Sequence, residues 1–96
     1  MRKLAPVHPG EILKEEFLLP LGLSASQLAS AIKVPANRVT RLVNEQSGIS
    51  ADTARRLARA FNTTPDFWMN LQSRFDLQQS EDTAPRLDDI KPIVKA

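Results

Sequence analysis

The chain of 96 residues contains no cysteine and no tyrosine, only three glycines and a single histidine. Without cysteine, neither a disulfide nor a thiolate metal site can form, and a reducing cytosol is the natural compartment. His8 has no second histidine or cysteine to join it in a metal site or a catalytic triad, so a role at a helix entry is the better interpretation. The widely spaced glycines leave no glycine-rich phosphate loop. We therefore expect neither an enzyme nor a bound metal or cofactor.

Long apolar runs are missing as well. No stretch approaches the roughly 20 apolar residues of a membrane-spanning helix. The basic N-terminal segment, residues 1–10, lacks the apolar core of a signal peptide. We therefore expect no membrane partner and a cytoplasmic location. The hydrophobic fraction of 42% and the charged fraction of 25% are ordinary for a globular protein and fit a single domain.

Positive charge is concentrated in the first two thirds of the chain. Residues 1–64 hold 9 Lys or Arg against 5 Asp or Glu, whereas residues 65–96 hold 4 against 6. A positive field of this kind is expected of a nucleic-acid-binding face. Chance asymmetry on a solvated surface explains it equally well, so charge alone does not decide the function.

Helical periodicity and capping residues predict an all-α fold. A first helix begins near Pro9 and is ended by Pro20 and Gly22, because proline suits a first turn and both residues interrupt a helix later on. Ser24 or Ser26 caps a second helix. The remaining predicted helices cover about 36–44, 51–61 and 65–79, with Ser50 and Thr64 as caps and Asn62 at a left-handed helix end. We expect residues 1–79 to form a compact five-helix domain and residues 80–96 to form a short extended or mobile tail.

The segment from Ser26 to Asn44 reads as two short helices joined by a turn at residues 33–35. Apolar residues of its second helix share one side, and the opposite side is polar and contains no acid. Arginine can pair with guanine, asparagine with adenine, and threonine with a phosphate or a thymine methyl group. The second helix therefore has the surface that a DNA major groove requires, and the start of the first helix can hold a phosphate. The candidate DNA-binding residues are Ser26, Gln27, Ala36, Asn37, Arg38, Thr40, Arg41 and Asn44.

A simple surface helix with ordinary polar residues is the competing interpretation of this pattern. Two adjacent short helices, a three-residue turn and small alanines at the helix contact favour a helix-turn-helix motif instead.

The last predicted helix is more apolar than one core face needs, although any single aromatic residue there is more often part of a core than of an interface. Trp68, Leu71 and Phe75 lie along it. Two recognition helices must lie about 34 Å apart to enter successive major grooves on one side of DNA. We therefore expect these three residues to form a two-fold contact in a homodimer.

Three motifs place this pattern in a family. They are HPGEIL at residues 8–13, ISADTARRLARAF at 49–61, and TPDFWMNLQ at 64–72 followed by FDL at 75–77. Over about residues 7–78 the chain resembles helix-turn-helix proteins of the phage-repressor (Xre/Cro, lambda-repressor-like) type. More closely, it resembles the HigA antitoxins, also called VapI, of bacterial toxin-antitoxin modules.

The resemblance implies a compact five-helix antitoxin, usually a homodimer. Such a protein binds its own operator DNA and represses its operon. It also neutralises a partner toxin of the HigB type, which resembles the RelE-like mRNA endonucleases. The positions that the family uses at the start of the recognition helix correspond to Ala36, Asn37, Arg38, Thr40 and Arg41.

This sequence departs from the family pattern at the turn and at the start of the recognition helix. Lys33 stands where glycine is common, so it must adopt a left-handed backbone. Pro35 stands where a polar cap is common, and it leaves the first amide groups of the next helix without a side-chain acceptor. Ala36 replaces an amide side chain, which weakens base reading at that position.

Two other functions remain open from the sequence. One is a stand-alone Xre-family transcriptional regulator without a toxin. The other is a toxin-binding module whose DNA binding is weak. For the toxin contact, the first helix and the tail are candidates, and residues 90–94 could add a strand to a sheet of the partner.

Overall fold

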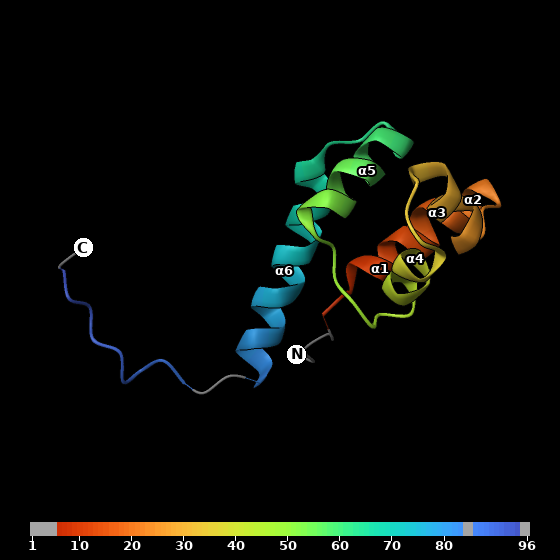
Figure 1. Cartoon of the computed structure of the whole chain (residues 1–96). Coiled ribbons are helices and arrows are strands. Elements are labelled where there is room, and N and C mark those ends of the chain that lie inside the picture. The colour runs from red at the N-terminus through yellow and green to blue at the C-terminus, as the bar shows by residue number, and fades with distance from the viewer. Residues whose placement is uncertain (1–5, 84–85, 95–96) are drawn as a thin grey trace.

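The computed structural model describes residues 6–83 and 86–94. Of the basic N-terminal segment, residues 1–5 lie outside these ranges. The regular elements of the described residues are all helical. They make up five helices, as predicted, because the first three elements are continuous (Figure 1). The elements are α1 Pro9–Ile12, η1 Leu13–Leu18, α2 Leu19–Leu21, α3 Ala25–Ile32, α4 Ala36–Val43, α5 Ala51–Phe61 and α6 Pro65–Thr83.

The elements α1, η1 and α2 follow one another without a break and make one helix. His8 caps its start, because the Nδ1 atom of His8 accepts the N–H of Gly10 at 2.9 Å. The role of His8 at a helix entry is thus confirmed. The expectation that Pro20 ends this helix was wrong, since Pro20 lies within its last turn and Gly22, with φ 66°, follows the end.

The π-helical winding of η1 explains how Pro20 is tolerated. Proline donates no hydrogen bond, and its ring crowds the carbonyl of the residue four positions earlier. A π-turn links each N–H to the carbonyl five residues earlier, as seen for Leu19, whose N–H donates to the carbonyl of Lys14. This wider winding separates the ring of Pro20 from the carbonyl that it would otherwise meet.

A reciprocal capping pair fixes the start of α3. The Oγ atom of Ser24 accepts the N–H of Gln27 at 3.0 Å, and the Oε1 atom of Gln27 accepts the N–H of Ser24 at 2.8 Å. Ser24, rather than Ser26, is therefore the cap. Lys33 has φ 62° at the end of α3, and Pro35 precedes α4 without a side-chain cap, as the sequence predicted for both.

The ends of α5 and the start of α6 also follow the sequence signals. Ser50 caps α5 through the N–H of Thr53, and Asn62 ends it in the left-handed region. Thr64 accepts the N–H of Phe67 at the start of α6. The last helix passes the predicted end at residue 79 and reaches Thr83.

Trp68 lies at the centre of the core and has no exposed surface. Its Nε1 atom donates to the Oγ1 atom of Thr63 at 2.8 Å. We predicted that Trp68 contacts a second copy of the chain. Its side chain is not available for such a contact, because the core of its own chain encloses it. The largest other fully buried side chains include Leu13, Leu28, Leu42, Leu57 and Val39.

The backbone of α1 comes unusually close to α4. A Cβ atom on Gly10 would lie 1.9 Å from the carbonyl oxygen of Leu42. Only glycine permits this approach. The contact braces α4 from the side opposite its polar face.

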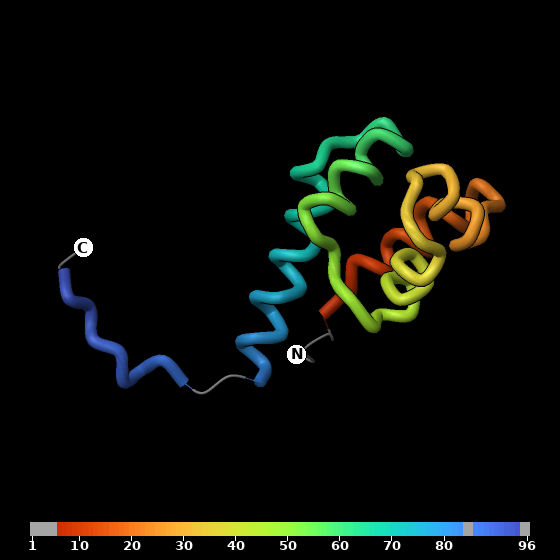
Figure 2. The backbone as a smooth tube through the Cα atoms, in the orientation of Figure 1, coloured from red at the N-terminus to blue at the C-terminus, as the bar shows by residue number. Residues whose placement is uncertain are grey.

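The described part of the tail, residues 86–94, lies apart from the helices (Figure 2). It forms no strand in this range. Its apolar side chains are exposed, including Ile90, Ile93 and Val94. Within the described residues, every helix is too short or too polar to span a membrane.

Candidate nucleic-acid interface

The helix α4 divides into a buried side and a polar side. Val39 and Leu42 are each 1% exposed, and Val43 is half-buried beside them. This burial leaves the opposite side of the helix facing solvent. The candidate residues on α4 and at its end are all exposed: Ala36, Asn37, Arg38, Thr40, Arg41 and Asn44.

The exposed residues differ in which atoms they can offer to a ligand. The side chains of Asn37 and Arg41 form no hydrogen bond or ion pair with the residues that the structure describes, so their side-chain donors are available. The hydroxyl of Thr40 donates to the carbonyl of Ala36 at 3.1 Å, so Thr40 offers its methyl group rather than a donor. Asn37 and Arg41 therefore have free side-chain donors for a ligand, whereas the hydroxyl donor of Thr40 is already engaged.

The start of α3 lies on the surface with its predicted residues Ser26 and Gln27 exposed. The Oε1 atom of Gln27 is engaged with Ser24. A glutamine amide has two further donors on its nitrogen. Gln27 can therefore cap the helix and still donate to a phosphate.

A hollow of about 370 Å³ lies between the polar side of α4 and the loop that leads to α5. Around this hollow the structure brings together two sets of residues. The predicted residues of α4 are Asn37, Arg38 and Arg41. The residues that the sequence had not assigned to the interface are Ser47, Gly48 and Ser50. A loop that ends at a helix N-terminus is suited to a phosphate, so this hollow extends the candidate interface beyond α4.

Arg38 is exposed but is not free. Its Nη1 atom lies 2.7 Å from the Oδ2 atom of Asp52, in the first turn of α5. The same oxygen accepts the Nε–H of Arg56 at 2.9 Å. The guanidinium groups of Arg56 and Arg38 hold the pKa of the Asp52 carboxyl below its ordinary value of 3.8, so Asp52 is ionised near neutral pH.

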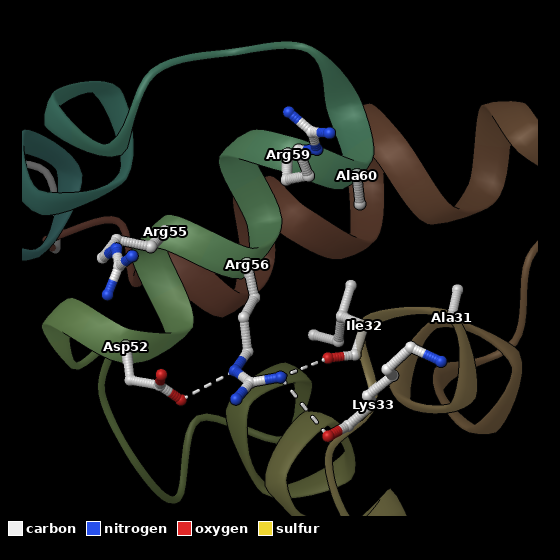
Figure 3. A pocket seen from close by; sticks show the side chains of 8 residues that line it. All are labelled: Ala31, Ile32, Lys33, Asp52, Arg55, Arg56, Arg59 and Ala60. Carbon is white, nitrogen blue, oxygen red and sulfur yellow. Dashed lines mark hydrogen bonds and ion pairs between the residues drawn. The ribbon is translucent and has the colours of Figure 1, made fainter.

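Arg56 links Asp52 to the turn of the motif (Figure 3). Its Nη1 atom donates to the carbonyl of Ile32 at 2.7 Å and lies 3.4 Å from the carbonyl of Lys33. Helix ends leave such carbonyls without a partner, and Arg56 supplies one. Arg56 reaches these carbonyls across a hollow of about 470 Å³ between α3 and α5, while Arg59 points away from the contacts.

Asp52 and Arg56 were not among the residues that the sequence suggested. Their spacing of four positions, with the acid first, is a known ion-pair pattern on helices and could have indicated the pair. The contacts of Asp52 with Arg38 and of Arg56 with Ile32 join residues 14 and 24 positions apart. Periodicity carries no information about contacts of that kind.

Comparison with known proteins bears directly on this surface. A helix-turn-helix family model matches residues 13–68. Virulence-associated protein I of Dichelobacter nodosus is 44% identical over 95% of this chain and 84% of its own length. Antitoxin HigA-1 of Vibrio cholerae is 41% identical over 97% of this chain and 85% of its own length.

Solved structures give the same result for the fold. The Pseudomonas aeruginosa antitoxin HigA, determined with the higBA promoter, superposes with a TM-score of 0.85 at 46% identity, over 93% of this chain and 99% of that one. A second solved structure from P. aeruginosa, of a protein in complex with its operator DNA, gives a TM-score of 0.87 at 45% identity, over 95% of this chain and 100% of that one.

Proposed function

Because the chain belongs to the HigA-type antitoxins of the helix-turn-helix family, we propose that it binds its own operator DNA and represses its operon. This family is non-enzymatic. The observation that carries the proposal is the polar side of α4, where Asn37 and Arg41 keep unoccupied donors on a helix that the core holds in place. Two structural relatives contain promoter or operator DNA, which supports the assignment.

We place α4 in the major groove. Arg41 pairs with a guanine edge, Asn37 pairs with an adenine edge, and Thr40 offers a methyl contact. Ser26 and Gln27 at the start of α3, together with the loop at Ser47 and Gly48, hold the DNA backbone. Ala36 and Asn44 border the face at its two ends. Backbone contacts of this kind position the protein, whereas the contacts of α4 supply the sequence preference.

We also propose that the chain neutralises a HigB-type toxin resembling the RelE-like mRNA endonucleases, and that it acts in the cytoplasm. The similarity to named antitoxins supports this partner. The first helix and residues 90–94 remain the candidate contacts. If residues 90–94 add a strand to the toxin, their amide hydrogens become protected from exchange when the toxin binds; unchanged exchange excludes this contact.

A gel-shift experiment tests the two functions together. The full chain is titrated onto the DNA upstream of its own gene, with and without the product of the adjacent small basic reading frame. We expect a specific shift with the chain alone and an altered shift with the toxin. A chain that binds the toxin but shifts no upstream DNA better than unrelated DNA contradicts the repressor function.

A toxin-binding module with weak DNA binding is the second candidate. Two features favour weak DNA binding. Ala36 offers no polar group to a base, and Asp52 already engages Arg38. A stand-alone regulator without a toxin is the third, and the absence of any adjacent toxin gene supports that alternative.

A further inference from the structure

An acidic side chain meets the proposed DNA-binding face at Asp52. We propose that Asp52 is a specificity-determining residue, which holds Arg38 in one position over the DNA and keeps it from binding phosphates without regard to sequence. The inference rests on the proposed operator binding. Asp52 does not itself touch DNA. It is a positioning residue that acts through Arg38.

The geometry fixes Arg38 to the body of the protein through two links. The Oδ2 atom of Asp52 lies 2.7 Å from Nη1 of Arg38 and 2.9 Å from Nε of Arg56. Arg56 is held in turn by the carbonyl of Ile32 at 2.7 Å. Arg56 therefore holds the Asp52 carboxylate on the side of the protein body. A chain of contacts runs from the end of α3 through α5 to the outward side of α4.

The arrangement leaves Arg38 able to bind a base. A guanidinium has five N–H donors, and the contact with Asp52 engages one of the two donors on Nη1. The remaining donors face a direction that Asp52 and Arg56 determine. An arginine held this way presents a defined edge to a base pair, whereas a free arginine can turn to the nearest phosphate.

The contribution of the pair to folding is expected to be small. The side chains of Arg38 and Asp52 are 41% and 50% exposed, and exposed ion pairs stabilise proteins little. Asp52 also engages the charge of Arg38, so Arg38 gains less from a phosphate in a backbone-only binding mode. Disfavouring the unspecific mode in this way increases discrimination without increasing affinity.

The substitution Asp52→Asn tests the proposal, because it removes the charge and keeps the side-chain shape. Binding of the full chain is measured against the upstream operator duplex and an unrelated duplex of equal length, over a range of salt concentrations. We expect tighter binding to the unrelated duplex, with a salt slope steeper by about 0.9, the value for one added phosphate contact. The ratio of operator to unrelated affinity should fall about five- to tenfold, at the low end of what one base contact supplies.

The matched control is Asp66→Asn. Asp66 occupies the same position in the first turn of α6 that Asp52 occupies in α5, directly after the first helical residue. The control therefore makes the same change of charge at the same helix position. We expect it to leave the affinity ratio unchanged.

The double variant Arg38→Ala with Asp52→Asn, compared with Arg38→Ala alone, shows whether Asp52 acts through Arg38. We expect no further change in the affinity ratio when Asp52 is altered in the absence of Arg38. A further fall would instead assign Asp52 a general repulsion of DNA and overturn its positioning role. Equal weakening on both duplexes, with a lower unfolding temperature, would assign it a structural role and overturn the proposal as well.

The experiment separates this inference from the function on which it rests. If the wild-type chain prefers the operator and Asp52→Asn keeps the same ratio, only the role of Asp52 is overturned. If the wild-type chain does not distinguish the two duplexes, operator binding and the role of Asp52 both fail.

Discussion

Gly10 shows how one small residue supports the surface on the far side of α4. A Cβ atom at this position would lie 1.9 Å from the carbonyl oxygen of Leu42 and 2.8 Å from its carbonyl carbon. Both atoms belong to the backbone of α4 and cannot rotate away. Any side chain at Gly10 therefore has to push the first helix and α4 apart.

We predict that Gly10→Ala lowers the free energy of unfolding by about 1–3 kcal/mol, the usual cost of overpacking, as measured by urea denaturation. The control is Gly48→Ala, whose Cβ would meet only the end of the Gln72 side chain at 2.7 Å. That side chain can move, so a smaller loss is expected. Equal losses would show that the contact of Gly10 with α4 is not the cause.

The sequence identified the polar residues of α4 from periodicity, because one turn of helix separates buried from exposed positions. It also placed the cap at Ser50 and the left-handed residues Lys33 and Asn62, since these signals are local. The contacts of Gly10 with Leu42 and of Asp52 with Arg38 depend on how helices pack. They join residues far apart in the chain, so a single sequence contains no pattern that predicts them.

At the scale of elements, the turn between α3 and α4 carries strain that its family avoids. Lys33 has φ 62°, a left-handed conformation that costs a residue with a Cβ atom about 1–2 kcal/mol. Glycine adopts it freely but loses more entropy on folding. Arg56 offsets part of the strain by binding the carbonyls of Ile32 and Lys33 at the α3 end of this turn.

We predict that Lys33→Gly raises the free energy of unfolding by about 0.5–1 kcal/mol, the strain relieved less the added entropy of glycine. Thermal and urea unfolding measure the change. Asn62→Gly is the comparison, because Asn62 has a similar φ of 55° but asparagine tolerates it. Lys33→Ala keeps the strain while removing the charge. If it stabilises the chain as much as Lys33→Gly, charge rather than strain is responsible.

The sequence did not predict the ends of the first helix and of α6 correctly. Pro20 is normally a helix breaker, yet η1 winds as a π-helix and carries the chain past it to Leu21. The last helix reaches Thr83 although its final turns bury little. Both differences concern helix ends, where competing local preferences are close in energy.

For the whole molecule, operator binding favours a dimer. Trp68 is enclosed in the core and cannot form the proposed two-fold contact. The residues of α6 after Trp68 are the ones left to form it. Leu71 and Phe75 are half-buried there, and the ring of Phe75 already packs against His8 at 4.8 Å. Leu77 is 67% exposed and extends the proposed contact along the same helix.

We predict a dimer in sedimentation experiments at micromolar concentration, and a shift toward monomer for Leu77→Asp because the charge would be buried in the contact. Leu19→Asp is the control, since Leu19 is 59% exposed on α2, away from this part of α6. A wild-type chain that sediments only as a monomer would remove α6 as a dimer contact. A dimer that Leu77→Asp leaves intact would place the contact elsewhere.

If the outward side of α4 reads the operator, Arg41 is the side chain whose loss should show it. Arg41 is exposed, lines the hollow beside the α4–α5 loop, and its side chain has no partner among the described residues. The decisive measurement is the affinity of the wild-type chain and of Arg41→Ala for a panel of operator duplexes, each with one base pair changed. Arg74→Ala, which removes the same charge from exposed α6, is the control.

We expect Arg41→Ala to lose about 1–3 kcal/mol of binding free energy on the operator and to lose discrimination at one base pair of the panel. Arg74→Ala should leave the panel unchanged. Equal weakening on every duplex would assign Arg41 to a phosphate. An unchanged affinity on all duplexes would contradict the claim that α4 reads the operator.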